Sequence, residues 1–315
     1  MPKKIVFFGE CMFELAPVEG GLLKPGFAGD VFNSAVYLKR TQAAAEANFF
    51  SAVGTDDLSE GLIKRIHEEN VNTDFVFRKE DRIVGAYYVQ LDDEGERSFT
   101  YWRNQSAAKR ALDFVNDDVI ERLAQNDYFF YSGISLAVIE DDLQETFWSL
   151  LKTLREKGVK VIFDPNFRPK LWENRPEMLG LYEQAFASCD LLLPGIEDFT
   201  FLCGLTTVEE VVDYLKSFEI PEIIIKNGPH TVTVVEAERG LFEIPIEAAK
   251  TVVDTNSAGD SFNGSYIGAR MAGGTIEEAV ARAATVAKEV IQHRGAIVPE
   301  AAFTQFINEL DGVEA

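Results

Sequence analysis

A run of small polar residues leads into a helical pattern late in the chain, and its residue types suit anion chemistry. The run reads Asp254-Thr255-Asn256-Ser257-Ala258-Gly259-Asp260, and helical spacing continues to about residue 272. The first backbone N–H groups of such a helix have no intrahelical partner, so together with the helix dipole they can bind an anion. Gly259 has no side chain to block close approach. The run therefore predicts an anion site at a helix start.

Asp260 lies in the first turn of this helix, beside the expected anion. A carboxylate there can accept the proton of an attacking hydroxyl while the N–H groups stabilise charge on a transferring phosphoryl group. A structural interpretation stays open, in which Asp254 or Asp260 only caps the helix. The length of the whole run favours the catalytic interpretation. Gly264 and Gly268 follow on one helix face, which predicts close packing against a sheet.

The elements that must position this run read as strands alternating with helices over 315 residues. This order predicts an α/β fold with a doubly wound, mostly parallel sheet covered by helices on both faces. The expected strands are 5–8, 47–53, 128–132, 159–163, 191–193 and 223–226, with an edge hairpin at 231–237 and 240–246. The expected helices are 31–40, 58–69, 117–125, 143–157, 208–218 and 276–293. Capping boxes at Thr207 with Glu210 and at Thr275 with Glu278 mark two helix starts.

Two regions interrupt the alternation. Residues 13–27 are rich in Gly and Pro, and residues 85–102 read as two strands around a turn at 92–95. We expect one domain over 1–315, with a small sheet formed by about 11–28 and 84–104 that projects from it as a lid. A lid serves chemistry that must exclude water. A solvent-exposed hairpin without a role explains the second region equally well.

Composition argues against several classes of function. The net charge of −22 opposes nucleic-acid binding, which requires Lys and Arg to neutralise phosphates. No stretch reaches the roughly 18 apolar residues of a membrane span, and no signal peptide is expected. Cys11, Cys189 and Cys203 are too few and too scattered for a disulfide framework or a zinc site. We therefore expect a cytoplasmic protein that binds neither nucleic acid nor membrane.

The late run, continued as DTNSAGDSFNGSY, resembles the C-terminal signature of the ribokinase-like carbohydrate kinases of the phosphofructokinase B type. In that family the aspartate of the Gly-Asp pair is the general base, and the backbone amides before it form an anion hole. The resemblance implies Asp260 as the base and Ser257, Ala258 and Gly259 as the anion hole that also meets the nucleotide phosphates. Ser257 replaces the family's usual glycine, a mild departure because the contact uses backbone N–H. The resemblance covers nearly the whole chain.

A second family motif lies at 28–35, where a Gly-rich stretch precedes an asparagine and a helix. The resemblance implies that Gly29, Asp30 and Asn33 bind sugar hydroxyls. Taken without the resemblance, a turn with Asp30 as the helix N-cap explains these residues. Asn33 is the stronger indication of function, because asparagine inside a helix has no propensity reason to be there.

Three further features of the sequence resemble those of one branch of the family, which phosphorylates the sugar acid 2-keto-3-deoxygluconate. They are Tyr87 in the first lid strand, the Tyr-Trp-Arg stretch at 101–103, and the Asp-Pro-Asn-Phe-Arg stretch at 164–168. The resemblance implies that Tyr87 and Tyr101 contact the sugar acid, and that Arg103 and Arg168 bind its carboxylate through paired hydrogen bonds. The residues alone leave open that Arg168 pairs with a neighbouring acid and that Arg103 is a solvated charge.

The resemblance also implies ATP as the phosphate donor. Lys226 and Gly228, at the end of a predicted strand, resemble the family's nucleotide loop, although a simple turn explains them equally well. Asn166 is expected to reach the phosphates. Mg²⁺ is expected because the phosphates need charge neutralisation. The family's Asn-x-x-Glu stretch lacks its Asn here, so Glu197 or Asp198 is left to order the ion through water, and no residue is assigned as a direct ligand.

The expected reaction is therefore transfer of the γ-phosphate of ATP to the C6 hydroxyl of the sugar acid, giving 2-keto-3-deoxy-6-phosphogluconate. A fructokinase or ribokinase is the first alternative. A non-catalytic sugar-binding regulator is the second, although the presence of Gly259 and Asp260 argues against it. A dinucleotide-dependent dehydrogenase would carry G-x-G-x-x-G after the first strand, which this chain lacks. The aromatic faces of the lid hairpin further predict a homodimer, or a larger homo-oligomer, formed through the lid.

Overall fold

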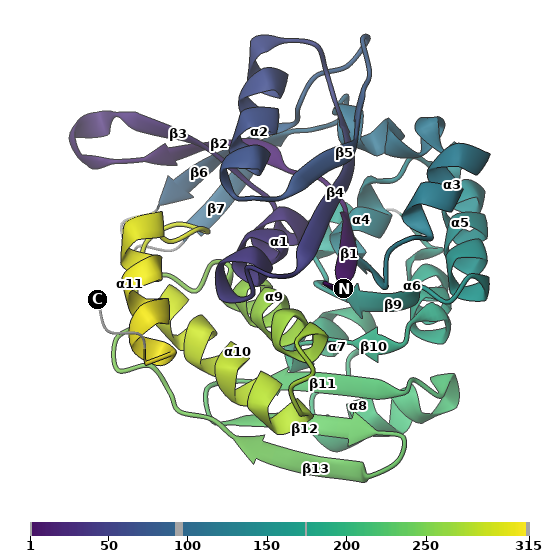
Figure 1. Ribbon diagram of the computed structural model, residues 1–315, viewed down its shortest axis with the longest axis vertical. Coiled ribbons are helices and arrows are strands. Elements are labelled where there is room, and N and C mark those ends of the chain that lie inside the picture. Colours follow the sequence, from purple (N-terminus) through teal and green to yellow (C-terminus); the bar gives the residue numbers. More distant parts are fainter. Residues whose placement is uncertain (1, 92–96, 174, 313–315) are drawn as a thin grey trace.

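The main body of the protein is a nine-stranded sheet with helices on both faces (Figure 1). The computed structural model describes residues 2–91, 97–173 and 175–312. The strand order is β13-β12-β11-β10-β9-β8-β1-β4-β5, parallel throughout except for the β11-β12-β13 edge. The bounds are β1 Lys4–Phe8, β4 Glu46–Val53, β5 Asn72–Arg78, β8 Tyr128–Ser132, β9 Lys160–Asp164, β10 Leu191–Leu192, β11 Glu222–Asn227, β12 Thr231–Glu236 and β13 Gly240–Pro245.

The central strands form because both of their faces are covered, as their unbroken apolar runs predict. In β1, Phe7 and Phe8 point to opposite faces and join two different core clusters. Strand β5 was missing from the expected strands. It is the edge strand of the sheet, and its first three residues, which include Asn72 and Asp74, are polar and stay largely outside the core.

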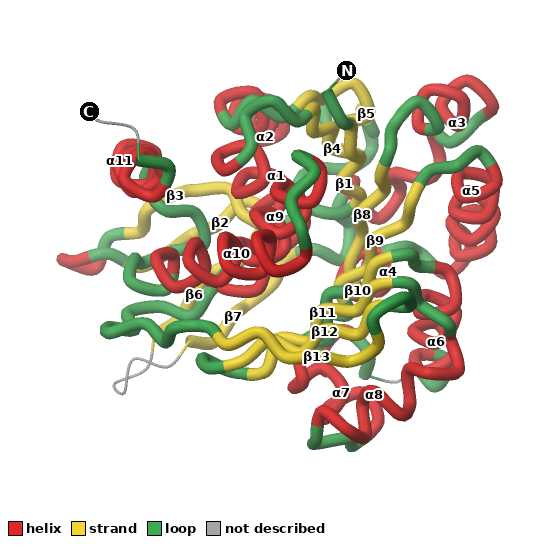
Figure 2. Tube along the Cα trace, turned by 60° about the horizontal axis from the view of Figure 1, so that its bottom comes forward, coloured by secondary structure: helices red, strands yellow, loops and turns green. Residues whose placement is uncertain are grey.

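The helices form two layers. Figure 2 shows α1, α9 and α10 on one side of the main sheet and α3, α5 and α6 on the other. Both expected capping boxes are present, at Thr207 with Glu210 and at Thr275 with Glu278. The bounds are α1 Asp30–Thr41, α2 Asp57–Glu68, α3 Asp117–Leu123, α4 Gly133–Val138, α5 Gln144–Glu156, α6 Met178–Ser188, α7 Ile196–Cys203, α8 Val208–Leu215, α9 Ala258–Met271, α10 Ile276–Val290 and α11 Glu300–Leu310.

Helix α9 packs closely on α1, and this contact corrects the expectation that Gly264 and Gly268 face the sheet. A Cβ atom at Gly264 would clash with the carbonyl oxygen of Ser34 in α1 and lie 2.8 Å from the backbone nitrogen of Leu38. A Cβ atom at Gly268 would lie 3.1 Å from Cβ of Gln42. Small residues indicate a close approach, but their spacing does not say which element approaches. The contact brings the first turns of α1 and α9 together.

Four strands form a second, separate sheet, which we call the lid sheet (Figure 1). Its order is β3-β2-β6-β7, with bounds β2 Met12–Pro17, β3 Leu23–Ala28, β6 Ala86–Leu91 and β7 Arg97–Trp102. Strands β2 and β3 are antiparallel, β2 and β6 are parallel, and β6 and β7 are antiparallel. The expected turn at 92–95 lies outside the described residues.

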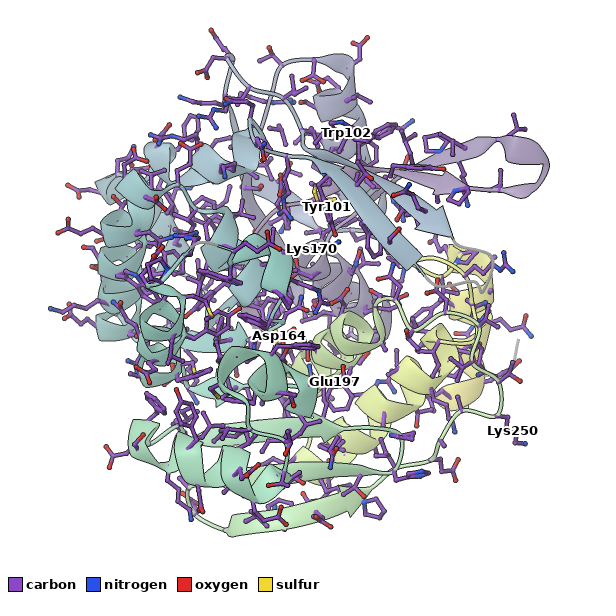
Figure 3. All side chains as sticks on the ribbon, turned by 180° about the vertical axis from the view of Figure 1, so that it is seen from behind. Tyr101, Trp102, Asp164, Lys170, Glu197 and Lys250 are labelled. Carbon is purple, nitrogen blue, oxygen red and sulfur yellow. The ribbon has the colours of Figure 1, made fainter. Side chains whose placement is uncertain are left out.

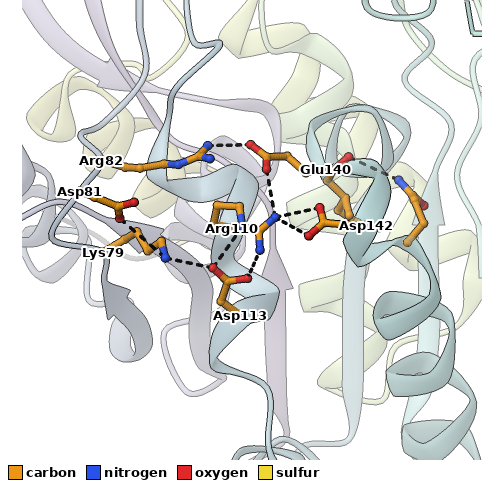
Figure 4. Close-up of polar contacts among 9 residues, drawn as sticks. Lys79, Asp81, Arg82, Arg110, Asp113, Glu140 and Asp142 are labelled. Carbon is orange, nitrogen blue, oxygen red and sulfur yellow. Dashed lines mark hydrogen bonds and ion pairs between the residues drawn. The ribbon is translucent and has the colours of Figure 1, made fainter.

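A cluster of charged residues ties both ends of the β6-β7 segment to the main body (Figure 4). Arg110 belongs to the 3-10 helix η2 (Ala107–Phe114) after β7, and its Nη1 lies 3.0 Å from Glu140 and 2.8 Å from Asp142. Arg82, which lies before β6, binds the other oxygen of Glu140 at 2.6 Å. Lys79 and Asp113 close the cluster at 3.1 Å. The segments before β6 and after β7, which we call the roots of the lid hairpin, are therefore both bound to the carboxylate of Glu140.

Some classes of site are missing from the described parts of the chain. In 2–91, 97–173 and 175–312, no helix combines the length and apolar character needed to cross a membrane. The same ranges contain no group of three or more His, Cys, Asp or Glu side chains placed to hold a metal ion. Cys11, Cys189 and Cys203 are all free thiols.

Candidate active site

A cleft of about 1430 Å³ lies between the lid sheet and the ends of the main-sheet strands. In Figure 3, Tyr101 lies on the lid side of this region, and Asp164 and Glu197 lie on the main-sheet side. Every residue that the sequence singled out for substrate, nucleotide or catalysis lines this cleft. These residues are Gly29, Asp30, Asn33, Tyr87, Tyr101, Arg103, Asn166, Arg168, Lys226, Gly228, Ser257, Ala258, Gly259 and Asp260.

The start of α9 presents backbone donors to the cleft. Ser257 adopts a left-handed conformation, with φ of +65°, and directly precedes the helix. Among the described residues, the N–H groups of Ser257, Gly259 and Asp260 donate to no protein acceptor. The N–H of Ala258 differs from expectation, because it donates to the carbonyl oxygen of Thr255 at 3.3 Å. Three donors at this helix start are therefore available to an anion.

The carboxylate of Asp254 fixes the loop that leads to these donors. One of its oxygens accepts a hydrogen bond from the N–H of Asn256 at 3.0 Å, and the other accepts one from the N–H of Gly295 at 2.7 Å. The interpretation of Asp254 as a cap of α9 is therefore wrong, because Ser257 is the N-cap residue and Asp254 binds the backbone of the preceding loop. Its effect is to keep Ser257 where the chain turns into the helix.

Asp260 lies partly buried in the first turn of α9, and two side chains orient its carboxylate. Its Oδ2 accepts hydrogen bonds from Nδ2 of Asn33 at 2.9 Å and from Oγ of Ser257 at 2.7 Å. Burial, with the nearby carboxylate of Asp30, raises the pKa of Asp260 to about 6. A carboxyl with this pKa is mostly ionised at neutral pH and holds a proton well, which suits a general base.

The first turn of α1 supplies the neighbouring polar groups. Gly29 is the N-cap residue, and a Cβ atom there would clash with the carbonyl oxygen of Glu10. The interpretation of Asp30 as an N-cap is wrong, because Asp30 is the first helical residue and its Oδ2 accepts a hydrogen bond from Asn166 at 2.8 Å. Asn33 reaches Asp260 across the α1-α9 contact. Asn33, whose place in a helix is not explained by helix propensity, thus has a hydrogen-bond partner in the cleft.

Two buried side chains hold a cation beside the start of α9. Nζ of Lys226 lies 3.1 Å from Oδ1 of Asn263 and 3.7 Å from Oδ1 of Asp164. Nδ2 of Asn263 donates to Oδ2 of Asp164 at 2.8 Å. The same ammonium lies 3.8 Å from where a Cβ atom of Gly259 would be. Burial raises the pKa of Asp164 to about 7.

Sequence reasoning missed Asp164 and Asn263 as parts of the site. Both lie inside stretches that were singled out, at 164–168 and at 254–266. An asparagine within α9 gives the same signal as Asn33 within α1, since neither is placed by helix propensity. The hydrogen bond between the two missed residues spans 99 positions, so their pairing follows only from the fold.

The two arginines of the cleft differ in their environment. Arg168 is exposed, forms no ion pair within the described part of the chain, and donates to the neighbouring carbonyl of Phe167 at 3.1 Å. Arg103 is only 8% exposed, and its Nη2 pairs with Oε2 of Glu10. Both structural interpretations are therefore wrong, because Arg168 forms no ion pair with any described acid and Arg103 is buried.

The lid contributes two tyrosines to the cleft wall. The hydroxyl of Tyr87 donates to Oε2 of Glu14 at 2.5 Å, so this hydroxyl already has a partner inside the lid. Burial, with the nearby charge of Glu14, raises the pKa of Tyr87 well above its usual range. The ring of Tyr101 lies 5.9 Å from the ring of Tyr87 and is partly exposed. Both rings offer apolar surface to a ligand.

Two adjacent acids at the start of α7 have different roles. Both carboxylate oxygens of Asp198 accept backbone hydrogen bonds, from Gly195 and from Phe167, at 2.8 Å each. Asp198 thus caps α7 and fixes the chain that carries Arg168. Glu197 is exposed and lines the cleft, and no hydrogen bond or ion pair joins it to a described residue. Its carboxylate is free to meet a hydrated cation.

Comparison with known proteins gives the family. The description "pfkB family carbohydrate kinase" matches residues 2–302. The 2-dehydro-3-deoxygluconokinase of Escherichia coli K12 is 40% identical over 307 residues, which cover 96% of this chain and 99% of that protein. The enzyme of the same name from Dickeya dadantii is 38% identical over 302 residues, covering 94% and 97%. A fructokinase with bound ATP from Xylella fastidiosa shares the fold, with a TM-score of 0.82 at 19% identity, covering 99% and 100%. The chain belongs to the pfkB family of carbohydrate kinases.

Proposed function

We propose that the protein transfers the γ-phosphoryl group of ATP to the C6 hydroxyl of 2-keto-3-deoxygluconate. The product is 2-keto-3-deoxy-6-phosphogluconate. One observation carries the proposal: the partly buried carboxylate of Asp260 lies beside three available N–H donors in a cleft that also contains Arg168, which forms no ion pair with a described residue. The names of the two relatives that match nearly full length support the choice of sugar acid.

In this mechanism Asp260 accepts the proton of the C6 hydroxyl as that oxygen attacks the γ-phosphorus, while the bond from the γ-phosphorus to the β–γ bridging oxygen breaks and ADP leaves. Asn33 and Ser257 hold Oδ2 of Asp260, so the carboxylate keeps one orientation while the proton moves. The N–H groups of Ser257 and Gly259 stabilise the negative charge that develops on the transferring group. Lys226, held by Asp164 and Asn263, adds positive charge on the same side.

The sugar acid would lie under the lid sheet. Arg168 and Arg103 bind its carboxylate, because a guanidinium offers two parallel N–H donors to a carboxylate. Gly29, Asp30 and Asn33 supply polar groups for its hydroxyls, and Tyr87 and Tyr101 cover its carbon face. A neutral sugar such as fructose offers no carboxylate to Arg168, which forms no ion pair with a described residue, whereas Arg103 keeps its partner Glu10.

The nucleotide would occupy the other end of the cleft. Ala284, Ala287 and Ile291 of the α10 side line it together with Val252 and Val253, an apolar surface suited to a purine. Lys226, Gly228 and Asn166 line the same cleft and would bind the phosphates.

Mg²⁺ fits this site in a limited way. The described residues offer no cluster of metal ligands, and the free carboxylate of Glu197 is suited to holding a hydrated ion through water. When bound, the ion would neutralise phosphate charge and add to the positive field at the transferring group.

A coupled assay tests the proposal. ADP release is measured with 2-keto-3-deoxygluconate, gluconate, fructose and ribose, each with ATP and Mg²⁺. The sugar acid should give the highest kcat/KM, because it alone combines the carboxylate with the 2-keto-3-deoxy chain. Preference for fructose or ribose would instead favour the fructokinase or ribokinase alternative. Binding of a sugar without ADP release would favour the non-catalytic regulator.

We further propose that the lid sheet forms a homodimer contact. Large apolar side chains are exposed on its strands and roots, with Trp102 at 58% and Ile83 at 56%, and in the connection between β2 and β3, with Leu22 at 68%. Exposed apolar surface of this kind marks interaction sites. The molar mass in solution tests this point, and a monomeric mass that persists at high protein concentration would exclude it.

A further inference from the structure

Glu10 lies directly after β1, at the base of the lid, and it is a buried carboxylate that the mechanism above does not use. It is 3% exposed and lines the cleft. Its Oε2 pairs with Nη2 of Arg103. Its Oε1 is enclosed and has no hydrogen-bond partner among the described residues. Burial of an ionised carboxylate is costly unless something compensates its charge, so this position calls for an explanation.

Glu10 contacts three segments of the expected substrate site. Its backbone oxygen abuts Gly29, the N-cap of α1. Its Oε1 lies 2.6 Å from where a Cβ atom of Gly85 would be, and Gly85 leads into lid strand β6. Its Oε2 holds Arg103, the residue that follows lid strand β7. The carboxylate of Glu10 therefore touches both roots of the lid hairpin, and its backbone oxygen touches the N-cap of α1.

The positive charges of the two cleft arginines, Arg103 and Arg168, are compensated to different degrees. The Arg103 guanidinium is buried and already neutralised by Glu10, whereas the exposed Arg168 has no carboxylate partner among the described residues. The pair of Glu10 and Arg103 adds no net charge to the cleft. A bound sugar carboxylate would thus meet one unneutralised cation, Arg168, and one guanidinium whose position is fixed but whose charge is compensated.

We propose that Glu10 is a positioning residue that fixes Arg103 and limits how strongly the cleft attracts an anion, so that it sets the affinity for sugar acids over neutral sugars. The inference rests on the proposed function, since it assigns Arg103 to the substrate carboxylate. Glu10 acts through Arg103 and does not itself touch the reacting atoms. Moderate attraction lets a charged product leave, because the product carries the same carboxylate and an added phosphate.

Two substitutions separate position from charge. Glu10→Gln keeps the shape of the side chain and one oxygen that can accept a hydrogen bond from Nη2 of Arg103. Its NH2 group replaces Oε1, an oxygen that accepts no hydrogen bond from a described residue. Arg103 then stays in place but becomes an uncompensated cation. Glu10→Ala removes the contact, so Arg103 loses its position. Glu69→Gln is the matched control, because Glu69 is a carboxylate buried against Arg40, at 2.6 Å, outside the cleft.

The experiment is titration calorimetry of each variant with 2-keto-3-deoxygluconate and with its uncharged carboxamide. Glu10→Gln should bind the acid roughly tenfold more tightly than the wild type and the amide equally well. Glu10→Ala should bind the acid roughly tenfold more weakly. Glu69→Gln should leave both affinities unchanged, although its melting temperature should fall.

Two results would overturn the inference. In the first, Glu10→Gln leaves the ratio of acid affinity to amide affinity at the wild-type value. In the second, Glu10→Gln weakens acid binding as much as Glu10→Ala does, which would mean that the negative charge itself is needed. If the proposed function itself is wrong, the titration gives a different result, because the wild-type protein would then bind neither compound. Melting curves establish that each variant is folded before titration.

Discussion

At the scale of single residues, Asp260 combines two properties that oppose each other. It is partly buried, and this desolvation disfavours its ionised form, yet its proposed role as a base requires that form. Asn33 and Ser257 donate to the carboxylate and partly offset the cost of burial. The ionised carboxylate of Asp260 therefore destabilises the fold, but in that form it can accept a proton.

Replacing Asp260 by Asn should strongly reduce turnover and stabilise the fold. Turnover should fall by about 10²–10⁴-fold, because the amide cannot accept a proton. The pKa of Asp260 is raised in the folded state, so ionisation opposes folding, and this penalty is absent at low pH and grows as pH rises from 4 to 6. At about 1.4 kcal/mol per pKa unit, the variant should gain roughly 3 kcal/mol in free energy of unfolding above pH 6.

Urea unfolding at pH 4 and pH 7 measures this gain. Equal stability of the variant and the wild type at both values would contradict the prediction. ATP binding by the variant is the control for an intact cleft, since the Asp260→Asn substitution leaves the N–H donors of α9 in place.

The pH dependence of kcat/KM should have an acidic limb with a midpoint near 6. The pKa of Asp260 is about 6 in the free protein, so lowering the pH protonates the base and removes its acceptor. Initial rates from pH 5 to pH 8 at low sugar concentration measure the midpoint. A profile that stays flat down to pH 5 would exclude Asp260 as the base.

Arg168→Ala should weaken the reaction with the sugar acid and spare neutral sugars. Loss of a charged hydrogen-bond donor costs about 1.5–3 kcal/mol, or roughly 10- to 150-fold in KM for the acid. Lys170→Ala is the control, because Lys170 is a nearby exposed cation lining the same cleft (Figure 3). Equal losses in the two variants would indicate a general positive field in place of specific recognition.

At the scale of elements, the contact between α1 and α9 decides whether the site assembles. Gly264→Ala should separate the two helices, because its Cβ atom would clash with the backbone of Ser34. Such overpacking costs about 1–3 kcal/mol of stability. The separation should also break the hydrogen bond from Asn33 to Asp260, so kcat should fall more than KM changes.

Gly180→Ala provides the comparison for this prediction. Gly180 lies in α6, and a Cβ atom there would have nothing within 4 Å. This substitution should raise stability by up to about 1 kcal/mol through helix propensity. Thermal unfolding and steady-state kinetics of both variants measure the two effects. A Gly264→Ala protein as stable and active as Gly180→Ala would show that the helices have room to separate without harm.

The elements that the sequence predicted best are those with a local cause. The buried strands have unbroken apolar runs, and the starts of α8 and α10 have capping boxes whose partners are three residues apart. Elements without such a cause were missed. Strand β5 has a polar first half, and the six-residue helix α4 is too short for a periodic pattern. Its capping box is built from Ser132 and Ser135, which carry no Glu or Gln as a signal.

At the scale of the whole molecule, the cleft joins segments that lie far apart in sequence. Asn33 and Asp260 are 227 positions apart, and Glu10 and Arg103 are 93 apart. The resemblance to a family indicated which of these residues to expect in a site, except Glu10, Asp164 and Asn263. No spacing rule could have given the pairings, because they depend on the strand order and on how closely α1 approaches α9.

The charged cluster around Glu140 gives the lid a sensitivity that an apolar contact would lack. Its members lie near the surface, where dissolved ions shorten the reach of charge from about 10 Å at 0.1 M salt to about 3 Å at 1 M. The stability of the main body depends mostly on the packing of apolar side chains, which added salt hardly weakens. Concentrated electrolyte should therefore loosen the roots of the lid well before it unfolds the protein, so the ionic strength around the protein should set how firmly the lid hairpin is anchored to the main body.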